Sequence, residues 1–196
     1  MKPFSEASEN NREPILVVLR EAFAQVSGVL EIGSGTGQHA VHFAQHLPHL
    51  TWQTSDLPVH HAGIQAWLDE AQLANARPPI ALDVNDKPWP VTPVDGVFTA
   101  NTLHIVSWPE VVCLLAGAGQ LLPPGGVLCI YGPFNYGGQF TSESNARFDS
   151  WLKARDPHSG VRDFEAVCAV ALEHGLALQH DHAMPVNNRT LVFHRH

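Results

Sequence analysis

Three glycines at alternate positions, Gly33, Gly35 and Gly37, follow the short apolar stretch 29–32 and precede a stretch with helical periodicity. Glycine permits a sharp turn and a close backbone approach to a ligand, and a helix N-terminus favours an anion. A strand, a glycine turn and a helix in this order predict a ligand-binding corner at the carboxyl end of a parallel strand. The alternative is a tight turn without a ligand, which three glycines in five residues would make costly in chain entropy.

The residues around this turn narrow the class of ligand. A dinucleotide-binding turn has the glycine spacing G-x-G-x-x-G, but Gln38 stands at the sixth position here. Glu31, two residues before Gly33, would repel a pyrophosphate and suits a ligand that carries an ammonium group. An NAD-dependent oxidoreductase is therefore the least favoured class of enzyme.

Acidic side chains also follow the next two expected strands. Asp56 ends the stretch 50–56 and lies 19 positions after Gly37, the spacing of an acid that accepts hydrogen bonds from ribose hydroxyls. Asp83 lies in a third short strand, expected over 80–84 after a break at the two prolines 78–79. Ordinary roles stay open for both: Asp56 as a solvated acid at a strand end and Asp83 as a loop cap.

A fourth strand, expected over 94–100, runs directly into Asn101, Thr102 and His104. Polar side chains at the carboxyl end of a central strand face the binding crevice of a doubly wound sheet. His104 is a candidate general base near neutral pH, although its apolar neighbours equally suit a hydrogen-bonded core residue.

The elements that position these residues alternate between strand and helix. Alternation implies a parallel sheet with right-handed crossovers, so we expect an α/β, Rossmann-like three-layer α/β/α sandwich. Its sheet is expected to be seven-stranded and mostly parallel, with the last strand antiparallel. Within the helix expected over 143–153, Phe148, Trp151 and Leu152 should share one face. The other expected helices cover 14–23, 38–47, 62–74, 109–122 and 163–174, and the later strands 127–131, 176–184 and 190–194.

Length and composition favour one domain over residues 1–196, because 44% of the residues are hydrophobic and only 15% are charged. A net charge of −8, with 11 Lys and Arg and no basic run, excludes an obvious nucleic-acid partner. No apolar run reaches the length of a membrane span and the N-terminus is too polar for a signal peptide, so we expect a cytoplasmic protein without membrane contact. Three widely spaced cysteines agree with reduced core thiols: Cys113, Cys129 and Cys168.

Histidines and arginines raise two further questions of chemistry. His39, His42 and His46 lie at helical offsets of three and four, but without an acid or thiol partner they do not predict a metal site. Four of the five arginines in the last third of the chain could clamp an anionic substrate group or form ordinary surface ion pairs. They are Arg147, Arg155, Arg162 and Arg189.

Two segments flank the expected crevice. Residues 1–13 are polar and precede the first expected helix, which makes them a candidate lid. The stretch 132–146 is rich in glycine, aromatic and amide side chains, and loops at this edge of such a sheet carry substrate recognition.

The motif E-x-G-x-G-x-G at 31–37 resembles the first motif of class I S-adenosylmethionine (SAM) methyltransferases, and the turn L-x-P-G-G at 122–126 is also similar to theirs. Blocks along nearly the whole chain resemble one family, domain of unknown function 938, which includes methyltransferase-like protein 26. The family usually has an arginine where this chain has Asn10. If that arginine binds a carboxylate of the substrate or cofactor, the role is weakened here or passes to Arg12. The blocks are NREPIL (11–16), GTGQH (35–39), WQTSD (52–56), YGPF (131–134), SESN (142–145), RDP (155–157) with RD (162–163), and MPVNNRTL (184–191).

This resemblance implies a SAM-binding domain that methylates a small molecule. Glu31 and the glycine turn would hold the methionyl end of SAM, Asp56 the ribose, and Asp83 with Val84 the adenine. The implied cofactor set is Glu31, Gly33, Ser34, Gly35, Gly37, Asp56, Leu57, Asp83, Val84, Asn101 and Thr102. The implied acceptor set is Asn11, Arg12, Asn135, Asn145 and Arg155, with His104 and Tyr136 as catalytic candidates.

Methyl transfer is a displacement at a carbon that the sulfonium already activates, so the protein mainly supplies proximity and alignment and needs no catalytic triad. Two alternatives keep SAM as the ligand. One is a SAM-binding module without turnover that acts through a protein partner. The other is an enzyme that uses a different carbon of SAM.

Overall fold

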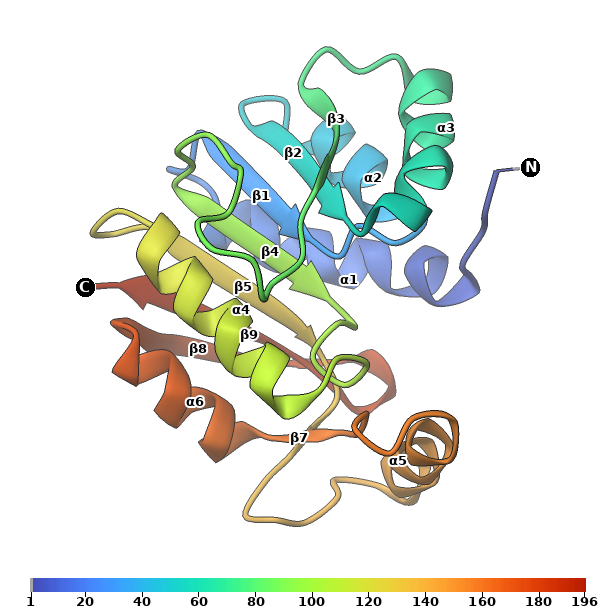
Figure 1. Cartoon of the computed structure of the whole chain (residues 1–196), viewed down its shortest axis with the longest axis vertical. Helices are drawn as coiled ribbons and strands as arrows, with labels where there is room; N and C mark the ends of the chain where they lie inside the picture. The colour runs from blue at the N-terminus through green and yellow to red at the C-terminus, as the bar shows by residue number, and fades with distance from the viewer. Residues whose placement is uncertain (1) are drawn as a thin grey trace.

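The computed structural model describes residues 2–196 as a central sheet with helices on both faces (Figure 1). The seven strands lie in the order β3-β2-β1-β4-β5-β9-β8. They are β1 (Gly28–Ile32), β2 (Thr51–Asp56), β3 (Ala76–Ala81), β4 (Gly96–Ala100), β5 (Val127–Gly132), β8 (Leu176–Met184) and β9 (Asn188–Arg195). The helices are α1 (Glu6–Ala22), α2 (Gln38–His46), α3 (His61–Ala71), α4 (Trp108–Leu121), α5 (Glu143–Arg155) and α6 (Phe164–Glu173).

Only β9 runs against the other strands of the sheet, and it pairs antiparallel with both β5 and β8. Strands β8 and β9 form a hairpin joined by the short 3₁₀-helix η2 (Pro185–Asn187), and the hairpin places β9 inside the sheet and β8 at its edge. A second, two-stranded sheet pairs β6 (Phe134–Asn135) with β7 (Arg162–Asp163) in parallel. The expected seven-stranded sandwich with an antiparallel last strand is thus confirmed.

The core has two apolar layers, one on each face of the sheet. Neighbouring side chains of a strand point to opposite faces, so Leu30 packs with α4 and α6 while Val29 packs with α1 and α2. Both faces of the central strands are covered, and β5 is accordingly buried along its whole length. None of the helices in residues 2–196 is both long and apolar enough to cross a membrane.

Helix α1 begins at Glu6, so the expectation that it starts at Pro14 was wrong. Ser5 caps the helix, because its side-chain oxygen accepts a hydrogen bond from the N–H of Ser8 at 3.2 Å. Acidic residues in the first turn, Glu6 and Glu9, add favourable interactions with the helix dipole. Residues 6–13 of the candidate lid therefore form the first two turns of α1, and Pro14 lies in the helix interior.

Strand β3 spans Ala76–Ala81 and contains Pro78 and Pro79, so the strand expected over 80–84 was placed too late. Proline cannot donate a hydrogen bond to a neighbouring strand, which confines it to edge strands and bulges. Strand β3 is an edge strand, and its register against β2 shifts at this point. Asp83 and Val84 consequently lie in the loop beyond the strand.

Helix α5 lies apart from the two main helix layers, beyond the carboxyl ends of the strands (Figure 1). Its buried residues are Asn145, Asp149 and Leu152, whereas Trp151 is 51% exposed. Phe148 and Trp151 do share a face, where their rings stack with centroids 5.9 Å apart, but this face is only partly buried. The reason is that α5 packs on polar loops, to which two of its buried side chains donate or accept hydrogen bonds.

Candidate functional site

The glycine turn connects β1 to α2 and has all three glycines in the left-handed region, with φ of +72° at Gly33, +57° at Gly35 and +91° at Gly37. A Cβ atom on Gly33 would lie 2.9 Å from Thr102 Oγ1, and one on Gly37 would lie 3.0 Å from Ile64 Cα. A Cβ on Gly35 would meet no atom within 4 Å. Packing thus requires the outer two glycines, while the middle one borders open space beside the turn.

Glu31 lies under this turn with only 2% of its surface exposed. Its Oε2 accepts hydrogen bonds from Ser34 Oγ at 2.8 Å and from Trp52 Nε1 at 3.1 Å. Burial raises the pKa of Glu31 to about 7, and the negative charge of Asp56 acts in the same direction. The carboxyl group therefore joins β1, the turn and β2 from inside the fold.

Asp56 ends β2, as expected, and its side chain reaches the glycine turn. Its Oδ2 accepts a hydrogen bond from the N–H of Gly35 at 2.7 Å, and its Oδ1 accepts one from the N–H of Leu57 at 2.7 Å. The Nε2 atom of His60 lies 3.9 Å from Oδ1. Asp56 and Gly35 thus form one corner, which combines a carboxylate with backbone that carries no side chain.

Thr102 closes the other side of the turn. Its Oγ1 lies 2.8 Å from Thr99 Oγ1, which in turn lies 2.9 Å from the carbonyl oxygen of Ile32. Asn101 has a φ of +57°, a conformation that asparagine tolerates better than most residues, and its N–H donates to the Tyr131 carbonyl at 2.9 Å. The chain therefore turns sharply at the end of β4 and brings Thr102 against Gly33.

Asp83 makes the contacts of a loop cap. Its Oδ1 accepts hydrogen bonds from both the backbone N–H and the side-chain amide of Asn85, at 2.9 and 3.0 Å. Val84 is buried in the core, and its carbonyl lies 3.5 Å from Trp89 Nε1. The N–H of Leu82 donates to the Asp56 carbonyl, which keeps this loop next to the end of β2.

His104 is buried on the loop between β4 and α4. Its ring stands edge-on to the ring of Phe148, with centroids 5.1 Å apart. A Cβ atom on Gly132 would lie 3.7 Å from its Nδ1, which places the imidazole at the end of β5. Burial, helped by the positive charge of Arg162, lowers the pKa of His104 to about 4, so the ring is neutral at pH 7.

Tyr136 makes its contacts with the far strands of the sheet. Its hydroxyl donates to Asp181 Oδ2 at 2.8 Å, and its ring stacks on Phe164 at 4.7 Å. Arg189 binds the same carboxylate through Nε at 2.7 Å. Burial raises the pKa of the Tyr136 hydroxyl, which therefore stays protonated and bound to Asp181.

Two predicted acceptor residues lie on α1. Asn11 Oδ1 is 2.7 Å from His39 Nε2, and Arg12 pairs with Glu9 at 2.6 Å. Of this pair, Asn11 therefore links α1 to α2, and Arg12 is held within its own helix.

The other predicted acceptor residues lie on or near α5. Asn145 donates to Thr141 Oγ1 at 3.0 Å and to the Asn187 carbonyl at 3.3 Å, which fastens α5 to η2. Asn135 donates to the Val161 carbonyl at 3.4 Å. Arg155 lies over the ring of Trp151 at the opposite end of α5. Their described contacts hold α5 and its neighbouring loops in place, and none of these contacts reaches Asp56 or Gly35.

Two residues that were not assigned to the site from the sequence hold its segments together. Gln38, noted only because it is not glycine, accepts the N–H of Ser5 at 2.6 Å and so ties the turn to the start of α1. Arg162 donates to backbone carbonyls of the loop that carries His104. Its partners are carbonyl oxygens, which every residue has, so no sequence pattern could have identified them.

The histidines of α2 lie side by side without forming a metal site. His42 and His46 have ring centroids 4.3 Å apart, and His39 faces Asn11. Across residues 2–196 no three His, Cys, Asp or Glu side chains gather closely enough to hold a metal ion. The three cysteines are free thiols, of which Cys129 is fully buried.

Comparison with solved structures finds this fold in larger proteins. An O-methyltransferase family protein from Burkholderia thailandensis is 21% identical with a TM-score of 0.83, and the match covers 93% of this chain and 55% of that one. Human N-acetylserotonin methyltransferase, solved in complex with SAM, is 14% identical with a TM-score of 0.78, covering 97% and 53%. NcsB1, an O-methyltransferase from neocarzinostatin biosynthesis solved with SAM and 2-hydroxy-5-methyl naphthoic acid, is 16% identical with a TM-score of 0.80, covering 97% and 55%.

The chain therefore spans about half the length of these structures, and similarity at such identities shows a shared fold. Membership of a family rests on a different comparison. The family model described as protein of unknown function DUF938 matches residues 2–195, almost the whole chain. The protein belongs to the DUF938 family.

Proposed function

We propose that this protein is a SAM-dependent methyltransferase that acts on a small-molecule acceptor. The observation that carries the proposal is the corner at which the Gly35 N–H meets Asp56 Oδ2 at 2.7 Å while Gly35 borders open space. The two methyltransferases of the same fold that were solved with SAM support it. Within DUF938, the resemblance to methyltransferase-like protein 26 is part of this proposal, as is a cytoplasmic location.

The residues of the corner fit the groups of SAM. Each oxygen of Asp56 accepts one backbone hydrogen bond, and a carboxylate oxygen has a second lone pair, so both oxygens can also accept a ribose hydroxyl. Leu57, Asp83 and Val84 follow β2 and β3 and would border the adenine. Glu31 and the glycine turn would hold the methionyl end.

Bound SAM would supply a methyl carbon that its sulfonium activates, and this chain's residues would bind, orient and exclude water. Asn101, Thr102 and His104 line the end of the central strand β4, beneath the proposed reacting centre. His104 is neutral at pH 7, because burial lowers its pKa to about 4, so its lone pair is free to accept a hydrogen bond from the acceptor, while so low a pKa makes the imidazole a weak base. We assign this role to His104, and we assign Tyr136, whose proton is held by Asp181, to shaping the acceptor side.

The segment before α1 has the contacts of a closed lid. The Trp67 Nε1 on α3 donates to the Pro3 carbonyl at 2.7 Å, and Lys2 pairs with Glu70 at 2.6 Å. Gln38 holds Ser5 on the other side of the same segment. We propose that residues 2–5, with the first turns of α1, cover the cofactor, and that 132–146 serves the acceptor.

Calorimetric titration with SAM, S-adenosylhomocysteine and NAD tests the proposal. We expect micromolar binding of the first two, at least tenfold weaker binding to Asp56→Ala, and no heat with NAD. Asp69→Ala removes an exposed acid of α3 and is the matched control, which should bind SAM as the wild type does. No heat with either SAM ligand would overturn the proposal. Analysis of spent cofactor after incubation with candidate acceptors tests turnover, since methyl transfer leaves S-adenosylhomocysteine.

A further inference from the structure

The loop that carries His104 is held by its carbonyl oxygens. All four carbonyls of residues 103–106 accept hydrogen bonds from the segment 159–162, which lies between α5 and α6 in the chain. Arg162 supplies two of the four donors. The pairs are Arg162 Nε with Leu103 O at 2.8 Å, Gly160 N–H with His104 O at 2.9 Å, Ser159 Oγ with Ile105 O at 2.5 Å, and Arg162 Nη2 with Val106 O.

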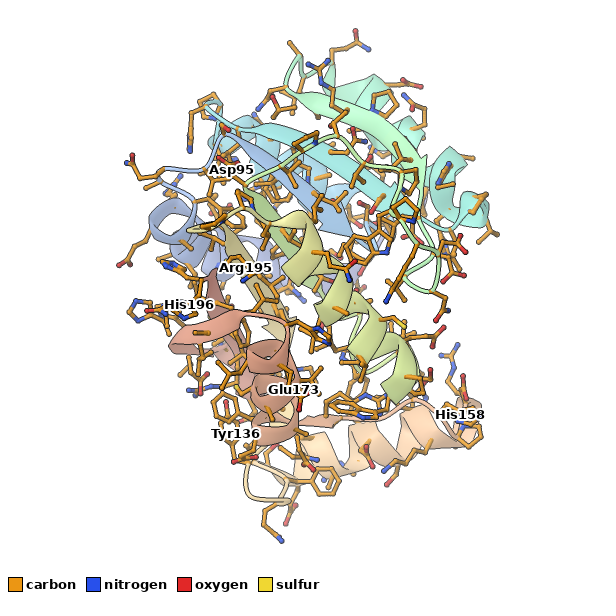
Figure 2. All side chains as sticks on the ribbon, turned by 60° about the vertical axis from the view of Figure 1, so that its left-hand side comes forward. Asp95, Tyr136, His158, Glu173, Arg195 and His196 are labelled. Carbon is orange, nitrogen blue, oxygen red and sulfur yellow. The ribbon has the colours of Figure 1, made fainter. Side chains whose placement is uncertain are left out.

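Helix α5 holds this segment from the other side through Asp149, which is 5% exposed. The N–H of Val161 donates to Asp149 Oδ1 at 2.9 Å, and Lys153 neutralises the carboxylate through Oδ2 at 2.7 Å. A Cβ atom on Gly160 would lie 2.8 Å from Asp149 Oδ1, so only glycine permits this approach. Figure 2 shows the labelled His158 beside the ribbon of α5, at the end of the molecule farthest from Asp95.

The geometry suits arginine better than any other residue. A guanidinium presents several N–H groups in one rigid plane, and Arg162 uses them on three carbonyls, those of Leu103, Val106 and His158. Lysine offers one flexible donor atom instead. Within residues 2–196 Arg162 forms no ion pair within 4.0 Å, so its contacts are those of a backbone clamp and not of a surface salt bridge.

Other contacts also restrain the His104 loop, because Leu103 is buried in the core and Val106 packs against the same cluster. The N–H groups of Ile105 and Val106 both donate to the carbonyl of Thr102, which forms a single tight turn. On the imidazole itself, the described contact is the edge-on packing against Phe148 of α5. The position of the ring therefore depends on α5 and the segment 159–162 staying together.

We propose that Arg162 is a positioning residue that fixes the imidazole of His104 at the carboxyl end of β4 by clamping the carbonyls of its loop. The clamp joins that loop to α5, so the acceptor side and the base form one rigid unit. The inference rests on the proposed function for its role in methyl transfer, but its structural content is measurable without SAM.

The test compares Arg162→Lys, which keeps the charge but not the planar donors, with wild type. Arg147→Gln, which changes an exposed arginine of α5, is the matched control. Hydrogen exchange of the Ile105 and Val106 amides measures the loop, and ¹⁵N-histidine spectra measure the ring, with the His104 signal assigned by its loss in a His104→Gln variant. We expect at least tenfold faster exchange and a displaced His104 signal in Arg162→Lys only, with SAM affinity within twofold of wild type.

Unchanged exchange and an unchanged His104 signal in Arg162→Lys would overturn the inference. Faster exchange in the loop accompanied by loss of SAM affinity, or by loss of the cooperative thermal transition, would also overturn it, because Arg162 would then be a general structural residue. If the wild type fails to bind SAM while Arg162→Lys still displaces His104, the proposed function fails and the positioning of His104 stands.

Discussion

Replacing Glu31 with glutamine should stabilise the protein above neutral pH, although it removes a residue proposed to hold the cofactor. The carboxyl group is buried, and its pKa is raised from an ordinary 4.5 to about 7. The folded protein therefore binds a proton between these two pH values that the unfolded chain releases. Stability supported by this group is fully present below pH 4.5 and declines as the pH rises toward 7.

The size of the effect follows from the two pKa values. A difference of about 2.5 units corresponds to about 3 kcal/mol at 1.36 kcal/mol per unit, the upper limit of what ionisation of Glu31 costs above pH 7. Glutamine has the same shape and no charge, and its carbonyl oxygen can accept from both Ser34 and Trp52 in place of Oε2. We expect Glu31→Gln to exceed wild type by about 1–3 kcal/mol at pH 8 and to match it near pH 4.5.

Urea unfolding of wild type and Glu31→Gln at pH 4.5, 6, 7 and 8 measures this difference. Buried neutral His39, with a pKa lowered by burial to about 4, makes both proteins less stable as the pH falls below 6.5, so the difference between the two curves isolates Glu31. Glu173→Gln, which replaces an exposed acid of α6, is the control, and its stability should equal that of the wild type at every pH. A difference that stays constant from pH 4.5 to 8 would refute the assignment of a raised pKa to Glu31. In the same variants, loss of SAM affinity in Glu31→Gln alone would agree with its proposed role.

Three further substitutions separate architecture from function. Gly33→Ala should destabilise the fold by about 1–3 kcal/mol in thermal or urea unfolding, because its Cβ would lie 2.9 Å from Thr102 Oγ1 at a φ of +72°. Gly35→Ala meets no neighbour, so we expect a loss of only about 1 kcal/mol but at least tenfold weaker SAM binding; equal affinity would show that the ligand does not approach Gly35. Tyr136→Phe removes one hydrogen bond to Asp181 and should cost about 1–2 kcal/mol while leaving SAM affinity unchanged, and a large loss of affinity would place Tyr136 in the cofactor site instead.

Predictions that rested on local pattern were the most successful. The order of strand, glycine turn and helix at 28–46 was correct, because short-range constraints on φ and hydrophobic periodicity determine it. The acid expected at the end of the second strand was also correct, because Asp56 is the last residue of β2. The start of α1 was missed even though Ser5 and Glu6 are ordinary start signals, because Pro14 drew the boundary to a later turn.

Two other predictions failed because their outcome depended on the neighbours of an element. The two prolines of β3 indicated a break before the strand, and only the edge position of that strand allows them to lie within it. Helix α5 has aromatic residues at helical spacing, yet it packs on loops and so buries Asn145 and Asp149. Neither outcome is encoded in the segment concerned, since each is decided by what lies next to it.

The sequence by itself determined the alternation of strands and helices, the glycine turn and the acid that ends β2, because periodicity and backbone sterics act over a few residues. The tertiary structure alone decided the partners of side chains that meet across long separations. Tyr136 binds Asp181 45 positions away, and Arg162 reaches Leu103 59 positions away, through groups whose identity carries no signal of their partner. Burial likewise decided the charges, because desolvation in the finished fold keeps His104 neutral and raises the pKa of Glu31.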